Sequence, residues 1–379
     1  MRVLYISSPG LGGANVSLAL LINELSHQEV KAKVIVPLDS SVQLFRKYGV
    51  DAYNVDLRLD IWPSTTTFVG KLLFFPRFLY HFLVNVKAFA KINKIVAEFR
   101  PDIIHTNVSV ISLGYKIARK HSIPHVWHIR EYGTKDFGWK LYPSFTAYCD
   151  RLADSFSISI TKDILKHFNI SPLKGRVIYN GIRHKFSSLE PYGDRQSFLY
   201  VGSITEKKGF SELIQAYCIY FQNGGRELLI VAGTGKEKYI QEQKRYLNDY
   251  GCLDYVNFLG HSDSIDSLMR SAKALIVPSL NEGFGRITAE AMFNGCIVIG
   301  KNTGGTKEQF DNGLNLCNHE IGIRYNSYTD LAEVLISFPC ISEKELDCYR
   351  HNAFVTVNSL YTIEKNANEV MGLYNHILK

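Results

Sequence analysis

The chain has 379 residues, of which 46% are apolar and 21% charged, and this balance excludes a disordered protein and favours two globular domains. The seven cysteines form no Cys-x-x-Cys pair, so neither a zinc site nor a redox motif is indicated, and scattered cysteines suit a reducing cytoplasm. No apolar window is long enough to span a bilayer, and the N-terminus lacks the apolar length of a signal peptide.

The net charge of +7 is unevenly divided along the chain. Residues 1–186 carry 25 Lys+Arg against 13 Asp+Glu, a balance of +12, and the remainder has a balance of −5. Partners of the basic half are therefore expected to be anionic: nucleic acid, lipid headgroups or a phosphorylated acceptor.

Short apolar segments alternate with helical patterns through the first half of the chain. This alternation predicts a doubly wound α/β domain over residues 1–183, opened by a strand and the tight glycine loop 8–13. The loop matches neither G-x-G-x-x-G nor the P-loop, so it indicates a turn and a ligand loop about equally. We expect strands over 2–7, 31–37, 52–55, 102–105, 124–128, 155–158 and 176–179, and helices over 14–27, 40–48 and 109–120.

Polar side chains gather where two of these strands end. His105 ends one strand, and His128, Arg130 and Glu131 stand close together at the end of another. Ligands of α/β sheets bind at this edge. A lone histidine there is more often structural, but three polar residues within four positions favour a binding site.

Residues 61–98 interrupt the alternation with an aromatic segment that is punctuated by basic residues and carries one acid, Glu98, near its end. A basic, aromatic, amphipathic helix can lie in a membrane interface. The alternative is a helix pair that packs on the core and has one solvated face. The excess of positive charge favours the membrane surface.

The polar residues 184–197, with Pro191 and Gly193, suggest a hinge before a second strand series. In this second half, glycine-bearing loops follow the strands and should collect at one edge of a parallel sheet. We expect strands over 198–201, 227–232, 255–259, 274–277 and 296–300, a helix over 210–221 and a helical tail over 342–379. The second domain should span 184–358, and a final helix over 359–379 could pack back on the first domain.

The most informative stretch is NEGFGRITAEAMFNG at 281–295, which follows a buried strand. Glu282 lies in a glycine loop and Glu290 about one turn inside the helix that follows. Glycines let a ligand approach the backbone, and a helix start suits a phosphate. Two acids beside a phosphate site suit a ligand that also has hydroxyl groups, such as a nucleotide sugar.

These motifs together resemble glycosyltransferase family 4, the group 1 transferases of the GT-B fold, of the kind that builds bacterial polysaccharide and lipopolysaccharide. The resemblance covers nearly the whole chain. It implies two Rossmann-like doubly wound domains that face a central cleft. The segments that carry it are the loop at 12–14, VIYNGI at 177–182, FLYVGSITEKKGF at 198–210, VNFLGHSD at 256–263 and NEGFGRITAEAM at 281–292.

The resemblance implies roles for the two acids and for one lysine. Glu282 would bind hydroxyls of the donor sugar, Glu290 would bind the ribose, and Lys208 would neutralise the departing diphosphate. His128 matches the first-domain histidine that reaches the donor sugar. Other donor-binding positions implied are Gly13, Ser203, Lys207, Gly233, Gly235, His261, Gly283, Phe284, Gly285 and Arg286.

One position departs from the family pattern, since Ser203 stands where the family often has an arginine. Either Lys207 or Arg286 could supply the missing charge. On the acceptor side, His105, Arg130 and Glu131 are the candidates, with Glu131 a possible base.

The resemblance implies a retaining hexosyl transfer that needs neither metal nor cofactor, with a UDP-sugar as the expected donor. From the basic first half of the chain we expect an acceptor that is lipid-linked or a polysaccharide, for a capsule or similar surface glycan. The same charge leads us to expect peripheral attachment to the inner face of the plasma membrane. Two alternatives stay open: a nucleotide-sugar epimerase on the same fold, and a non-catalytic nucleotide-binding protein. Nucleic acid is not an expected partner, because no recognition pattern for it is present.

Overall fold

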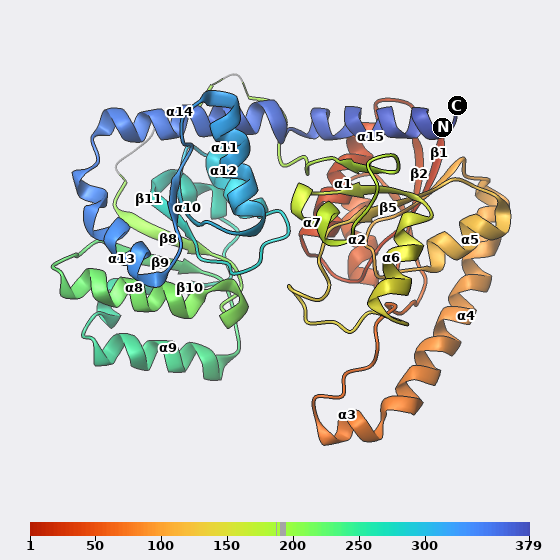
Figure 1. Cartoon of the computed structure of the whole chain (residues 1–379), viewed down its shortest axis with the longest axis horizontal. Coiled ribbons are helices and arrows are strands. Elements are labelled where there is room, and N and C mark those ends of the chain that lie inside the picture. The colour runs from red at the N-terminus through yellow and green to blue at the C-terminus, as the bar shows by residue number, and fades with distance from the viewer. Residues whose placement is uncertain (187, 190–194) are drawn as a thin grey trace. The chain divides into compact units, whose positions relative to one another are not determined.

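The computed structural model describes residues 1–186, 188–189 and 195–379, which form two compact units (Figure 1). Unit 1 comprises Met1–Gly181 and Ile363–Lys379, and unit 2 comprises Ile182–Thr362. The suggested hinge residues Pro191 and Gly193 lie outside the described residues.

Unit 1 contains a sheet of seven parallel strands in the order β3-β2-β1-β4-β5-β6-β7. The direction in which strands are added reverses between β1 and β4, which is the switch point of a doubly wound fold. The strands are β1 (Arg2–Ile6), β2 (Lys31–Val36), β3 (Asp51–Asn54), β4 (Ile103–Thr106), β5 (His125–Ile129), β6 (Phe156–Ser159) and β7 (Gly175–Val177). The helices beside them are α1 (Gly13–Ser26), α2 (Asp39–Lys47), α5 (Leu113–His121), α6 (Phe145–Ala153) and α7 (Lys162–His167).

The core of unit 1 also includes the last helix of the chain, α15 (Ile363–Ile377). Strand β1 is almost continuously apolar, because helices cover a parallel sheet on both faces. Helix α15 packs beside α1, and its apolar residues join the core that contains Val3 and Tyr5 (Figure 1). The residues that α15 adds to this core are Ala367, Val370, Leu373 and Tyr374.

Helices α3 (Phe68–Leu72) and α4 (Phe74–Phe99) depart from the regular pattern of unit 1. Helix α4 buries Ala88, Ile92 and Val96, which are spaced four residues apart in its C-terminal half. Its N-terminal half leads away from the sheet and carries α3 at its far end (Figure 1). The alternative of a core-packed helix pair therefore describes only the C-terminal part of α4.

Unit 2 contains six parallel strands in the order β10-β9-β8-β11-β12-β13. The strands are β8 (Ser197–Val201), β9 (Leu228–Ala232), β10 (Val256–Gly260), β11 (Ala272–Val277), β12 (Ile297–Lys301) and β13 (Ile323–Tyr325). The helices are η1 (Glu206–Lys208), α8 (Phe210–Gln222), α9 (Glu237–Asp249), η2 (Leu253–Tyr255), α10 (Ile265–Ser271), α11 (Arg286–Phe293), α12 (Gly304–Cys317), α13 (Tyr328–Ser337), η3 (Phe338–Cys340) and α14 (Glu343–Leu360). Both parallel-sheet units confirm the predicted α/β class.

One predicted helix begins later than the sequence suggested. A helix was expected over 109–120, but α5 begins at Leu113. The backbone N–H and hydroxyl of Ser109 donate to Glu131, at 2.9 and 2.7 Å, and the N–H of Ser112 donates to Asp60. These tertiary hydrogen bonds hold residues 109–112 outside the helix.

Candidate active site

The edge of unit 2 where its strands end carries an ion pair between two residues that the sequence had singled out. The Nζ atom of Lys208, at the end of η1, lies 2.6 Å from Oε2 of Glu282. The side chain of Glu282 is 15% exposed and that of Lys208 is 37% exposed. Among the described residues, Oε1 of Glu282 makes no hydrogen bond. The pair therefore presents one carboxylate oxygen and one ammonium group to a ligand.

A second ion pair lies on α11. Arg286 Nη2 is 3.0 Å from Oε1 of Glu290, one helical turn along, and both side chains are largely buried. The other carboxylate oxygen of Glu290 has no hydrogen-bond partner in the part of the chain that the structure describes. In each acid, one carboxylate oxygen pairs with a cation. The other oxygen can accept hydrogen bonds from hydroxyl groups of a ligand.

The loop that carries Glu282, Gly283, Phe284 and Gly285 is held by the start of α12, which the sequence analysis did not assign to the site. The N–H of Gly305 donates to the carbonyl of Glu282 at 2.7 Å. Gln309 Nε2 donates to the carbonyls of Phe284, at 2.5 Å, and Gly285, at 3.1 Å. Gln309 is buried, and a signal that could have found it is its place about one turn after Gly304 and Gly305, which follow a strand in the sequence.

Helix α11 begins at Gly285, whose φ of +81° puts it in the left-handed region. No side chain within the described residues caps this start. Uncapped N–H groups and the positive end of the helix dipole suit a phosphate. The predicted combination of acids and a helix start is therefore present in unit 2.

The other residues of unit 2 that were predicted to bind the donor make local contacts within the protein. A Cβ at Gly233 would lie 1.8 Å from the carbonyl oxygen of Gly202, so the close approach of two strand ends explains this glycine without a ligand. Gly235 packs in the same way against Ile204. The carbonyl of Ser203 accepts from Tyr200. His261 is 82% exposed and pairs with Asp263 at 3.4 Å.

Of the two residues suggested to replace the family arginine, Arg286 is the better placed. Its guanidinium reaches Glu290, one of the two acids of the cluster. Lys207 contributes its backbone carbonyl, which accepts from Leu280 N–H at 3.4 Å. The choice between the two cations stays a prediction.

In unit 1, the polar residues at the ends of β1, β4 and β5 form a buried network. Arg130 donates through Nε to Asn107, at 2.7 Å, and through Nη1 to Asn180, at 2.5 Å. Its Nη2 lies 3.4 Å from Nδ1 of His128. His105 Nε2 lies 3.2 Å from the same nitrogen. Both ring nitrogens of His105 are used inside the protein, so it supports His128 rather than facing a ligand.

Glu131 is the third acceptor-side candidate, and burial dominates its chemistry. The residue is 6% exposed, and its Oε1 accepts both hydrogen bonds from Ser109. Desolvation raises the pKa of Glu131 to about 7, although the bonds from Ser109 act in the opposite direction. A carboxyl with a pKa near 7 can exchange a proton at neutral pH.

The glycine loop of unit 1 is tied down by side chains. Asn15 Nδ2 donates to the carbonyls of Ser8 and Gly10, at 3.0 and 2.6 Å, and the Gly10 N–H donates to Ser41 at 3.0 Å. Gly13 is the first residue of α1, which has no side-chain cap within the described residues. This loop is therefore a fixed turn that leads to an uncapped helix start.

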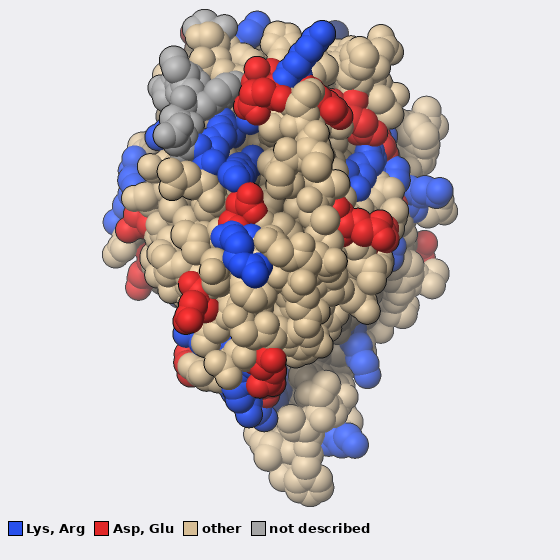
Figure 2. Space-filling model, turned by 90° about the vertical axis from the view of Figure 1, so that its left-hand side faces the viewer, with Lys and Arg blue, Asp and Glu red and all other residues tan. Residues whose placement is uncertain are grey.

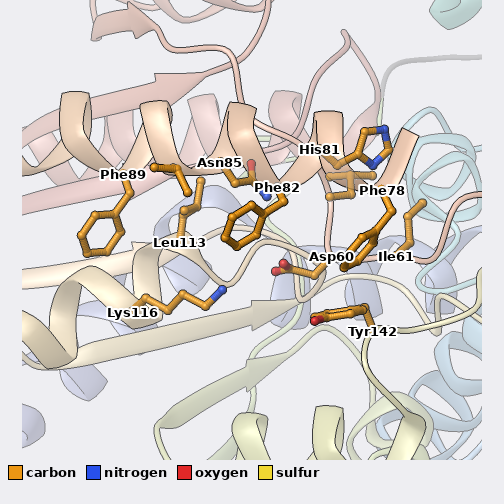
Figure 3. Close-up of a pocket in the computed structure, with 12 residues that line it drawn as sticks. Asp60, Ile61, Phe78, His81, Phe82, Asn85, Phe89, Leu113, Lys116 and Tyr142 are labelled. Carbon is orange, nitrogen blue, oxygen red and sulfur yellow. The ribbon is translucent and has the colours of Figure 1, made fainter. Parts of the chain in front are cut away.

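A pocket of about 260 Å³ lies under α4 in unit 1. Phe78, Phe82 and Phe89 of α4 form one wall, and Lys116 of α5 faces them from the other side (Figure 3). Lys116 is exposed and makes no side-chain hydrogen bond or ion pair within the described residues. The remaining lining residues are Leu59, Asp60, Ile61, His81, Asn85, Val86, Leu113 and Tyr142.

Charge and hydropathy at the surface are uneven. On the face drawn in Figure 2, acidic and basic side chains are interspersed rather than gathered into a patch of one sign. Helices α3 and α4, in contrast, expose large apolar side chains together with five basic ones. The apolar ones include Phe68, Val69, Leu72, Phe75, Leu79, Phe82, Leu83 and Val86, and the basic ones are Lys71, Arg77, Lys87, Lys91 and Lys94.

The described ranges 1–186, 188–189 and 195–379 contain no helix that is both long and apolar enough to cross a bilayer. They contain no group of three or more His, Cys, Asp and Glu side chains that could hold a metal ion.

Comparison with known proteins gives two family matches that adjoin along the chain. The model for glycosyl transferases group 1 matches residues 182–348. The model for glycosyltransferase family 4 matches residues 11–186. Together the matches cover both units, and both describe the same class of enzyme.

Individual relatives are distant. The uncharacterized glycosyltransferase MJ1607 of Methanocaldococcus jannaschii is 30% identical over 179 residues, which cover 42% of this chain and 44% of that protein. The capsular polysaccharide biosynthesis glycosyltransferase CapM of Staphylococcus aureus is 26% identical over 263 residues, covering 65% of this chain and 67% of that protein. The chain spans about half the length of the first curated relatives that it matches.

Solved structures establish the fold over the full length. The Anabaena protein HepE, crystallised in complex with UDP, superposes with a TM-score of 0.76 at 18% identity and covers 99% of this chain and 100% of its own. At this identity the structural likeness shows the fold, and the two family matches show the family. The chain belongs to the group 1 transferases of glycosyltransferase family 4 and has their GT-B fold.

Proposed function

We propose that this protein transfers a hexose from a nucleotide diphosphate sugar to a lipid-linked or polysaccharide acceptor, with retention of the anomeric configuration and without a metal. One observation carries the proposal: in unit 2, two acids lie beside two cations and a helix start, and among the described residues each acid has one carboxylate oxygen without a hydrogen-bond partner and the helix start has no side-chain cap. A nucleotide sugar needs this combination, because it joins hydroxyl-bearing rings to a diphosphate.

Each group of this cluster has a distinct task in the proposed reaction. Glu282 accepts hydrogen bonds from the sugar hydroxyls, and Glu290 accepts them from the ribose. Lys208 leaves or shares its pairing with Glu282 and faces the diphosphate, on which negative charge grows as the glycosidic bond breaks. The helix start at Gly285 adds N–H donors to the same oxygens.

We propose a UDP-sugar as the donor. Support comes from the Anabaena protein HepE, which was crystallised with UDP and with UDP-glucose. CapM of Staphylococcus aureus, named for capsular polysaccharide biosynthesis, supports an acceptor in a cell-surface glycan.

The first experiment is a thermal-shift panel with UDP, GDP, ADP and dTDP and their glucose conjugates, run with and without EDTA. A ligand that binds only the folded protein raises its melting temperature. We expect UDP and UDP-glucose to give the largest shifts and EDTA to leave them unchanged. A larger shift with another base would contradict the donor, and loss of the shift in EDTA would contradict metal independence. Turnover of UDP-glucose to another sugar nucleotide without an acceptor would instead identify an epimerase.

We further propose that α3 and α4 hold the protein at the inner face of the plasma membrane. The exposed aromatic and aliphatic side chains of these helices can enter the headgroup region, and the basic ones can face anionic lipid. The pocket under α4 supports a lipid-linked acceptor, because its aromatic wall suits an apolar chain and Lys116 suits a phosphate. The same helix would then bring the protein to the bilayer and contact the lipid.

Neutralising the basic residues of α3 and α4 should abolish binding to anionic vesicles. Changing Lys71, Arg77, Lys87, Lys91 and Lys94 to Gln removes about 1 kcal/mol of attraction per charge. Co-sedimentation with vesicles that contain phosphatidylglycerol measures the effect. Removing exposed positive charges at the start of α9 and within it, with Lys236, Lys238 and Arg245 of unit 2 changed to Gln, is the control and should leave binding intact. Equal binding by both variants would contradict a membrane role for α3 and α4.

A further inference from the structure

The pocket under α4 has a long aromatic wall. Phe78, Phe82 and Phe89 are spaced by four and seven residues, so their rings lie in a row along one side of the helix (Figure 3). The eleven residue steps from Phe78 to Phe89 extend this wall over roughly 16 Å. Because a volume of about 260 Å³ is spread over that length, the cavity is narrow. It suits one apolar chain and not two chains side by side.

Polar groups from three segments of unit 1 face this wall from the other side of the pocket. Lys116 lies on α5, Asp60 precedes α3 and Tyr142 precedes α6, and their ammonium, carboxylate and hydroxyl groups point into the same part of the pocket (Figure 3). Within the described residues, the side chain of Lys116 has no hydrogen-bond or ion-pair partner, and the hydroxyl of Tyr142 has no hydrogen-bond partner. Lys116 and Asp60 therefore face one cavity without pairing with each other. A few convergent polar groups in an apolar cavity indicate a site for a ligand with a polar head.

Hydrogen bonds fix this polar end before any ligand binds. Asp60 accepts through Oδ2 from the N–H of Ser112, and its carbonyl accepts from the N–H of Tyr142 at 3.2 Å. The Asn85 side chain of α4 accepts from the N–H of Arg58 at 2.8 Å and donates to the Arg58 carbonyl at 3.1 Å. These bonds join α4, the segment before α3 and the start of α5. A site that is already in place loses little binding free energy to ordering.

The pocket connects the apolar face of α4 with the acceptor-side candidates at the end of β5. Phe82 and Val86 line the pocket and are 57% and 51% exposed, so a chain can enter from the face that we propose to lie on the membrane. At the polar end, Asp60 and Glu131 hold the two ends of the turn 109–112. Because three residue steps span at most about 11 Å, a head group beside Asp60 lies close to Glu131.

We propose that this pocket binds the lipid of the acceptor as a single apolar chain that ends in a phosphate. The chain lies along the aromatic wall, Lys116 and Tyr142 donate to the phosphate oxygens, and Asp60 accepts from a hydroxyl group of the first sugar. The role of this ligand as acceptor rests on the proposed function. Binding of a single-chain lipid phosphate, in contrast, is a property of unit 1 and can be measured without a donor.

The first test is titration calorimetry with farnesyl phosphate, below its micelle concentration and without vesicles. Each isoprene unit adds apolar surface that the wall covers, so affinity should rise about tenfold from isopentenyl to geranyl phosphate, and again to farnesyl phosphate. Farnesol and inorganic phosphate each lack one part of the ligand and should bind at least about tenfold more weakly than farnesyl phosphate. Equal affinity for farnesol and farnesyl phosphate, or no binding of either, would overturn the proposal. Equally tight binding of dihexanoyl phosphatidylglycerol would overturn the single chain.

Two substitutions at the polar end should have opposite effects. Lys116→Gln should weaken farnesyl phosphate about tenfold and leave farnesol unchanged, because only the phosphate loses a charged donor. Asp60→Asn should strengthen farnesyl phosphate about threefold, since the amide oxygen can still accept from Ser112 while the negative charge is gone. Lys166→Gln, at an exposed lysine of α7, is the matched control and should change neither affinity. Unchanged affinity in Lys116→Gln, with an unchanged melting temperature, would refute the phosphate site.

Trp62 reports where the ligand binds. Its ring centroid lies 5.4 Å from that of Phe78 and 4.7 Å from that of Tyr142, and both of these residues line the pocket. Farnesyl phosphate should change the tryptophan fluorescence, and Trp62→Phe should remove this change and keep the affinity. A fluorescence change that persists in Trp62→Phe would place the ligand elsewhere.

Adsorption on the exposed face of α3 and α4 is the other source of binding that must be separated. The protein with the five basic residues of these helices changed to Gln should keep its affinity for farnesyl phosphate, because none of the five lines the pocket. Loss of binding in that protein, together with full binding by Lys116→Gln, would place the ligand on the exposed face and overturn the proposal.

Failure of this inference and failure of the proposed function give different results. If farnesyl phosphate binds as expected but the protein neither binds nor turns over a UDP-sugar, the proposed function is wrong and the ligand of the pocket stands. If sugar transfer to a lipid-linked acceptor is observed, Lys116→Gln should raise KM for that acceptor about tenfold without changing kcat. An unchanged KM would overturn the role of the pocket and leave the transfer in place.

Discussion

Replacing Lys208 with alanine should lower the rate of sugar transfer about a thousandfold, with little change in the affinity for UDP-glucose. In the proposed reaction the ammonium group stabilises charge that develops on the diphosphate in the transition state, and loss of such a group lowers kcat rather than binding. In the free protein the same ammonium neutralises Glu282, at 2.6 Å.

The measurement is release of UDP from UDP-glucose in the presence of acceptor. Lys208→Arg keeps the charge and should recover part of the rate, while Lys238→Ala, an exposed lysine of α9, should retain all of it. Because Lys208 is partly exposed, its ion pair contributes little to stability, and the melting temperature of Lys208→Ala should change little. A Lys208→Ala variant with full activity would disprove the role of this residue.

Replacing Glu290 with alanine should weaken binding of both UDP and UDP-glucose about thirtyfold. Hydrogen bonds to a charged carboxylate contribute more than neutral ones, and the ribose is common to both ligands. Replacing Glu282 with alanine should weaken UDP-glucose alone, because the proposed partner of Glu282 is the sugar. Titration calorimetry of the two variants with the two ligands tests both roles.

Glu242→Ala, an exposed acid of α9, is the control for the loss of one carboxylate and should leave both affinities unchanged. If Glu290→Ala weakened the binding of UDP-glucose but not that of UDP, the roles of the two acids would have to be exchanged. If neither variant changed either affinity, the donor would bind elsewhere.

The fold could be predicted because its strongest determinants are local. Buried parallel strands are short apolar runs, and the loops that follow them are rich in glycine, so the alternation was visible along the chain. The strand β13 (Ile323–Tyr325) was missed, because Arg324 stands between its two apolar residues and leaves no apolar run. The start of α5 was misplaced because Glu131 and Asp60 capture the backbone of 109–112 from distant positions.

The candidate site was predictable where its residues share one motif. Glu282 and Glu290 lie in a single loop and helix, so their spacing already placed them near each other. The partner of Glu282 was not visible, because Lys208 stands 74 positions away. Tyr374 and His105 are 269 positions apart, and nothing in either neighbourhood marks the pair. Contacts of this kind depend on how a sheet and its covering helices pack.

The place of α15 in the core of unit 1 affects how the protein is made. The hydroxyls of Tyr5 and Tyr374 meet across 369 positions, so strand β1 is synthesised long before the helix that completes its packing. Unit 2 lies between them as one continuous segment and can fold while synthesis proceeds. Unit 1 therefore completes its core only after unit 2 has been synthesised, and until α15 has left the ribosome the apolar residues that it covers are exposed to chaperones and to aggregation.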